Sequence, residues 1–160
     1  MVTERWFLKL DGITGESVNQ SHHGEIDIES WSWGVSNSGG GAAGGGGGSG
    51  KASFEDFHFV SRISKASPAL LLACATGSHI RQALLSGVRG AGKGTEFLTY
   101  KLRGVTVTSV VHGDAEEGPP TEQFSLNFTK VDVSYTPQST SGKTEPAVTA
   151  GWDVAANKKI

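Results

Sequence analysis

Two long stretches of this chain alternate apolar and polar residues as half-buried strands do, and in each the alternation changes phase midway. A strand that ran straight through such a change would turn its apolar side chains to water, so each strand must bend or bulge there. The bends are predicted at Glu29–Ser30 and at Thr129–Lys130. The two phases are defined by Ile26 and Ile28 against Trp31, Trp33 and Val35, and by Phe124, Leu126 and Phe128 against Val131, Val133 and Tyr135.

Strands that turn a corner pass from one sheet to another, as in a compact barrel or an orthogonal sandwich. Other stretches show the same period of two and predict further strands. These stretches are Trp6–Leu10, Leu98–Leu102, Val105–Val107 beyond Gly104, and Val148–Val154.

One segment, from Ser67 to Gly77, predicts a helix, with Ser67 as its cap, Pro68 in its first turn and Gly77 at its end. The segment is apolar all round, so we expect it to plug an open end of the barrel. The expected fold class is mainly β. We expect a single domain over residues 1–160, built as a compact barrel of two packed sheets with one short helix and a long glycine-rich loop at 38–51.

The composition excludes several classes of function. A net charge of −2 over 160 residues lacks the positive field that sequence-independent nucleic-acid binding requires. The single cysteine, Cys74, cannot form an intrachain disulfide. No apolar stretch reaches the length of a membrane span, and the first residues do not resemble a secretory signal. We therefore expect a protein made in the cytoplasm without a signal peptide, with no nucleic-acid partner and no membrane insertion.

No set of residues predicts a reaction, a metal site or a cofactor site. Gly50-Lys51 and Gly92-Lys93 imitate a phosphate-binding loop, but neither lysine is followed by the Ser or Thr that such a loop needs. The adjacent His22 and His23 point to opposite faces if they lie on a strand, so surface imidazoles are expected. Three acidic residues alternate with isoleucines on one strand, which predicts a solvated face; they are Glu25, Asp27 and Glu29.

Six segments in series resemble the haemolysin-coregulated protein (Hcp) family, the tube subunits of bacterial type VI secretion. They are Phe7–Ser17, Trp31–Gly34, the glycine-rich stretch, Ser67–His79, Ser125–Gln138 and Thr149–Lys159. One stretch, Leu84–Val88, departs from the pattern, because Gly87 interrupts the alternation of a regular strand.

The resemblance implies a small barrel that assembles as a hexameric ring with a central channel, and rings that stack into a tube. It further implies a contractile sheath around the tube, a spike protein at its tip and effector proteins inside the ring. Secretion to the exterior or into a target cell would then use this machine.

Two sets of residues are the candidate sites for assembly and cargo. If Trp31, Trp33 and Val35 point into the core, as we expect, their neighbours point out, and that small polar strip should line the channel. The strip is Ser30, Ser32 and Gly34. The glycine-rich loop is the candidate for ring and tube assembly, because ordering so much glycine is costly unless a neighbouring subunit supplies partners. Its named positions are Ser38, Gly39, Gly44, Gly48, Ser49, Gly50 and Lys51.

Other interpretations remain open at this stage. Ser32 on an ordinary solvent face and the loop as a plain connector are the alternatives for the two sites. For the whole chain, the main alternative is a monomeric barrel that binds a sugar or another small ligand through its tryptophans. Trp31, Trp33 and Trp152 share the parity of the core, whereas ligand stacking requires exposed rings. An enzyme of unrecognised type lacks a coherent nucleophile, base or metal set.

Overall fold

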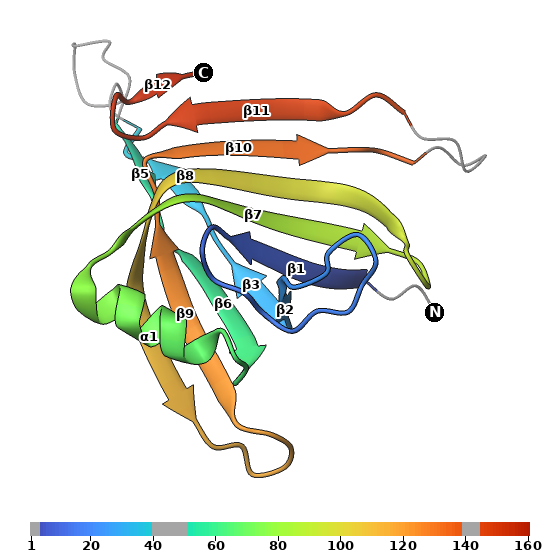
Figure 1. Ribbon diagram of the computed structural model, residues 1–160. Helices are drawn as coiled ribbons and strands as arrows, with labels where there is room; N and C mark the ends of the chain where they lie inside the picture. The colour runs from blue at the N-terminus through green and yellow to red at the C-terminus, as the bar shows by residue number, and fades with distance from the viewer. Residues whose placement is uncertain (1–3, 40–50, 139–144) are drawn as a thin grey trace.

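The computed structural model describes residues 4–39, 51–138 and 145–160, and it is mainly β (Figure 1). Its elements in chain order are β1 (Glu4–Leu10), β2 (Ile26–Ile28), β3 (Ser30–Ser32), β4 (Val35–Asn37), β5 (Ala52–Phe54), β6 (Phe57–Arg62), α1 (Ser67–Thr76), β7 (His79–Arg89), β8 (Thr95–Gly113), β9 (Thr121–Asn127), β10 (Lys130–Tyr135), β11 (Val148–Asp153) and β12 (Lys158–Lys159).

All pairings between these strands are antiparallel. The main sheet follows the order β12-β11-β10-β8-β7-β1-β2, and a second path from β8 runs through β9 and β6 to β3. A separate two-stranded sheet joins β4 and β5. Between β2 and β3 the wall is continued by the chain at Glu29, whose N–H donates to the Val60 carbonyl at 2.8 Å. The expected mainly β class is confirmed, but the wall is not a fully closed barrel.

Both predicted corners are present. β2 pairs with β1 and ends before Glu29, and β3 then pairs with β6. β9 pairs with β6 and with the second half of β8, whereas β10, after Thr129, pairs with the first half of β8 and with β11. β8 itself turns near Gly104, which has a φ of +60°. A Cβ there would press on the Thr129 side chain, so this corner requires glycine.

The core contains a continuous cluster of aromatic rings. Phe57 is fully buried, and its ring centroid lies 4.9 Å from that of Trp33 and 5.3 Å from that of Tyr100. Leu70 and Ala73 bring one face of α1 into the same core. Figure 1 shows α1 lying across β8 and β9 at the lower end of the molecule.

The helix is present where it was predicted, but two details are wrong. Ala66, not Ser67, occupies the N-cap position, and no side chain caps the helix. The helix is also not enclosed on all sides, because Leu71 and Leu72 are 52% and 61% exposed. Among the described residues, no helix is both apolar and long enough to cross a membrane.

The stretch that departed from the expected alternation forms a strand after all. β7 runs through Gly87, with a register shift against β8 between Gly87 and Val88. A side chain at Gly87 would collide with the six-membered ring of Trp6. The glycine therefore makes room for a packed indole and does not end the strand.

Candidate assembly surfaces

One side of the sheet formed by β3, β6, β9 and the second half of β8 carries small, mostly polar side chains. Cross-strand neighbours point to the same face of a sheet, so the pairing defines two rows across these four strands. We call this the polar face. Its rows are Ser32, His58, Ser125 and Ser109, and Ser30, Val60, Gln123 and Val111.

The polar face carries little charge, since His58 is the only titratable residue in the two rows. Its hydroxyl groups bond to one another: Ser125 Oγ lies 2.7 Å from Thr108 Oγ1 and 2.5 Å from Ser109 Oγ. Thr108 Oγ1 also donates to Asp56 at 2.7 Å. The surface is therefore hydrophilic and internally hydrogen-bonded, and the two charges that border it at the two ends of β6, Asp56 and Arg62, are of opposite sign.

The predicted strip lies partly on this face. Ser30 and Ser32 are exposed on β3, and Gly34 is half-buried between β3 and β4. The Gly34 carbonyl accepts from the Glu55 N–H at 3.0 Å. Sequence reasoning missed the partners on β6, β9 and β8, although the alternation of exposed His58 between buried Phe57 and Phe59 was a usable signal.

The glycine-rich candidate segment lies mostly outside the described residues. Ser38 and Gly39 are exposed just after β4, and Lys51 is exposed just before β5. Gly39 N–H donates to the Asn37 side-chain oxygen at 2.9 Å. Gly44, Gly48, Ser49 and Gly50 fall in the part that the structure does not describe.

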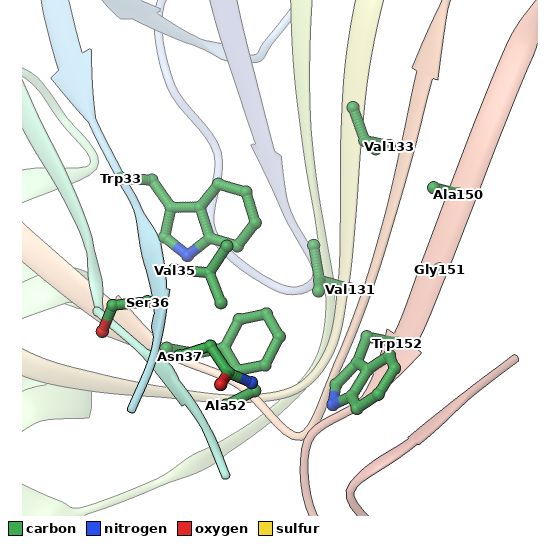
Figure 2. A pocket seen from close by; sticks show the side chains of 11 residues that line it. Trp33, Val35, Ser36, Asn37, Ala52, Val131, Val133, Ala150, Gly151 and Trp152 are labelled. Atoms are coloured by element: carbon green, nitrogen blue, oxygen red, sulfur yellow. The ribbon is translucent and has the colours of Figure 1, made fainter. Parts of the chain in front are cut away.

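A second surface is an apolar groove of about 440 Å³ between the β4–β5 sheet and strands β10 and β11 (Figure 2). Phe54 lies between two indoles, with ring centroids 6.1 Å from Trp33 and 6.4 Å from Trp152. Val35, expected in the core, is 53% exposed and borders this groove, so that prediction is wrong. We call the surface the tryptophan groove; it is lined by Trp33, Val35, Ser36, Asn37, Ala52, Phe54, Val131, Val133, Ala150, Gly151 and Trp152.

A buried histidine contradicts the expectation of surface imidazoles. His22 is 7% exposed and stacks on Phe7, with ring centroids 4.8 Å apart and planes inclined by 4°. Its two ring nitrogens lie 3.0 Å from Glu25 and 3.4 Å from Glu96. Burial raises the pKa of the Glu25 carboxyl above its ordinary value, and the hydrogen bond to His22 opposes that rise. The cluster ties the β1–β2 loop to the start of β8.

A serine, a carboxylate and a histidine also meet beneath α1. Ser67 Oγ donates to Glu122 Oε1 at 3.0 Å, and His112 Nε2 lies 2.7 Å from Glu122 Oε2. Glu122 is fully buried. The hydroxyl is bonded to the carboxylate and not to the imidazole, so the histidine is not placed to activate it as a nucleophile. Among the described residues, no three His, Cys, Asp or Glu side chains are arranged to hold a metal ion.

Comparison with known proteins gives one consistent match. A family model described as type VI secretion system effector, Hcp, matches residues 7–135. Protein hcp1 of Pseudomonas aeruginosa is 40% identical over 154 residues, which cover 94% of this chain and 95% of that protein. The crystal structure of Hcp1 from Salmonella typhimurium superposes with a TM-score of 0.77 at 33% identity, covering 98% of this chain and 99% of that one. A solved type six secretion system protein reaches a TM-score of 0.91 at 27% identity over 99% of this chain and 100% of that one.

Proposed function

Because the chain belongs to the Hcp family of type VI secretion proteins, we propose that it forms hexameric rings that stack into a tube and hold effector proteins in the channel. The same proposal gives it the sheath and the spike of the secretion machine as partners. It has no catalytic role in this proposal, since the buried Ser67–Glu122–His112 cluster lacks an activated nucleophile.

The observation that carries the channel role is the chemistry of the polar face. A wall that conducts folded cargo of varied charge should be hydrophilic, without a strong field of one sign and without a large apolar patch. Ser30, Ser32 and Gln123 meet that description, and Ser125 satisfies its hydroxyl within the sheet. We assign this face to the channel.

The segment 38–51 supplies the stacking contact in this proposal. It starts and ends on one two-stranded sheet, whose neighbouring exposed residues are Gly39 and Lys51. Fixing a residue costs about 1–2 kcal/mol, and glycine loses the most freedom. A stacked ring that supplies backbone partners would offset that cost. We expect amide hydrogens of this segment to exchange more slowly in tubes than in free rings, and equal exchange would contradict the stacking role.

The mass of the purified protein tests the ring. Light scattering should give about six times the 16.7 kDa of one chain, and electron microscopy should show circular particles. Solitary particles at high concentration would contradict the ring.

A monomeric mass would instead favour the small-ligand alternative. The tryptophan groove is the observation that supports this alternative, since Trp33 and Trp152 both border an open apolar surface. Quenching of tryptophan fluorescence by a panel of sugars, measured on the monomer, would then test it.

A further inference from the structure

In a single chain the tryptophan groove leaves apolar surface open to solvent and contains two polar groups without a hydrogen-bond partner in the described residues. The indole N–H groups of Trp33 and Trp152 are buried and have no hydrogen-bond acceptor among the described residues. An unmet buried donor costs about 1–3 kcal/mol. Both donors belong to an apolar surface that also leaves Val35 half exposed (Figure 2). Because both nitrogens are enclosed by the chain itself, it is the open apolar lining that a partner polypeptide would cover with apolar side chains of its own.

The same chain carries an exposed apolar surface on α1 that is suited to fill the groove. The outer side of α1 presents Leu71 and Leu72, whereas a helix facing water normally carries polar residues there. Hydroxyl groups lie at the end of the helix, where Thr76 Oγ1 and Ser78 Oγ are exposed and 2.5 Å apart. We call Leu71, Leu72, Thr76 and Ser78 the helix shoulder.

Opposite charges accompany the two surfaces. The turn between β8 and β9 is acidic, with three exposed carboxylates; they are Asp114, Glu116 and Glu117. β12 is basic and exposed, with Lys158 and Lys159, and it pairs with β11 beside the groove. Within the described residues, none of these five groups forms an ion pair. In Figure 1, α1 and the β8–β9 turn lie at the lower end, and β10, β11 and β12 at the upper end.

We propose that the helix shoulder of one copy docks in the tryptophan groove of the next copy, with the acidic β8–β9 turn facing the lysines of β12. The two surfaces differ and lie toward opposite ends of the molecule in Figure 1, so the contact is heterologous and repeats from copy to copy. Repetition closes a ring when the rotation between copies is a whole fraction of a turn. The inference rests on the proposed function for the ring, and it adds which surfaces meet. Opposite charges speed and orient the encounter, while the buried rings and leucines hold the contact.

Cross-linking tests this pairing directly. In a Cys74→Ser background, Leu72→Cys and Val35→Cys are introduced together, and the protein is oxidised mildly. The double variant should give a ladder of covalent species up to six chains on a denaturing gel, and each single variant should stay monomeric. Replacing Leu72→Cys by Val18→Cys gives the matched control, since Val18 is 88% exposed in the β1–β2 loop. That pair should give no ladder.

A charge substitution provides the second measurement. Leu72→Glu should convert six-subunit particles to folded monomers with the parent's circular dichroism spectrum, and Val18→Glu should leave the rings intact. Rings that survive Leu72→Glu and give no ladder overturn the pairing but leave the proposed function standing. Dimers formed by Val35→Cys alone would mean that two grooves meet each other and would also overturn it. A monomeric parent chain would instead overturn the proposed function itself.

Discussion

The polar face and the tryptophan groove differ in whether their buried polar groups find hydrogen-bond partners within a single chain. On the polar face, the Ser125 hydroxyl bonds to both Thr108 and Ser109. In the groove, the indole N–H groups of Trp33 and Trp152 have no acceptor within the described residues. Buried polar groups that already have partners within the chain need no further hydrogen bond from another molecule. The groove gains from a protein partner through its open apolar lining, which includes the exposed Val35, and not through these enclosed donors.

The two surfaces suit two different requirements on one small domain. A channel wall must contact cargo without holding it tightly, which suits small neutral side chains. A subunit contact must exclude water and bury large rings, as the centres of protein interfaces do. Strand β6 carries His58 of the polar face and the buried Phe57, whose ring stacks on Trp33 of the groove. Perturbations of this aromatic core should therefore affect both surfaces.

The largest effect is expected for Phe57→Ala. Phe57 lies on β6 and packs against Trp33 of the groove, next to His58 on the polar face. Its loss should reduce the free energy of unfolding by about 3–5 kcal/mol, because the surrounding rings cannot fill the cavity. Denaturant unfolding measures this, and His58→Ala on the same strand should change it by less than about 0.5 kcal/mol. Equal effects of the two substitutions would contradict a shared aromatic support.

A smaller loss is expected at the corner where β8 leaves one surface for the other. Gly104→Ala places a side chain at a φ of +60° and against Thr129, which should cost about 1–3 kcal/mol. Thermal unfolding should show the loss, and Gly104→Ala combined with Thr129→Ala should recover part of it. The matched control is Gly113→Ala, where a Cβ meets nothing within 4 Å. If Gly113→Ala is as costly as Gly104→Ala, the corner does not depend on this glycine.

The corners could be predicted from the sequence because they change the parity of large apolar residues. Ile26 and Ile28 face the core on one parity and Trp31 on the other, and burial forces the chain to turn between them. The same argument failed at Val35, because β4 leaves the main sheet and pairs only with β5. Parity along one strand says nothing about which sheet the strand joins.

The rest of the candidate surfaces depends on pairing between distant segments. Ser32 was identified as outward, but its neighbours His58 and Ser125 follow only from the registers of β3, β6 and β9. The groove joins segments about a hundred residues apart, so neither Trp33 nor Trp152 indicated it alone. His22 was misjudged for the same reason, since its second carboxylate comes from a distant strand.

Two buried serines on neighbouring strands differ in whether their hydroxyl groups are hydrogen-bonded. Ser125 Oγ is hydrogen-bonded, whereas Ser61 Oγ is buried without a partner in the described part of the chain. Ser125→Ala should therefore cost about 0.5–1.5 kcal/mol in unfolding free energy. Ser61→Ala should be neutral or slightly stabilising, because it removes an unpaired hydroxyl group and leaves a side chain of similar size. The reverse order, measured by urea unfolding, would show that hydrogen-bond satisfaction does not distinguish these sites.

The smallest effect on stability, and the most specific one on function, is expected for Ser32→Glu. Ser32 is exposed on β3, so the substitution should change the unfolding free energy by less than about 0.5 kcal/mol and leave the particle mass unchanged. In a ring it would place a carboxylate on every copy of the channel wall, and acidic cargo should be retained less well in co-purification.

Ser53→Glu provides the matched control for that experiment, because Ser53 is equally an exposed serine but lies on β5, away from the polar face. It should retain cargo as the parent does. If Ser32→Glu breaks the ring instead, Ser32 belongs to a subunit contact and the polar face is not the channel wall. If both variants retain cargo equally, then the wall is indifferent to charge at this position, and cargo must be held by a different part of the ring.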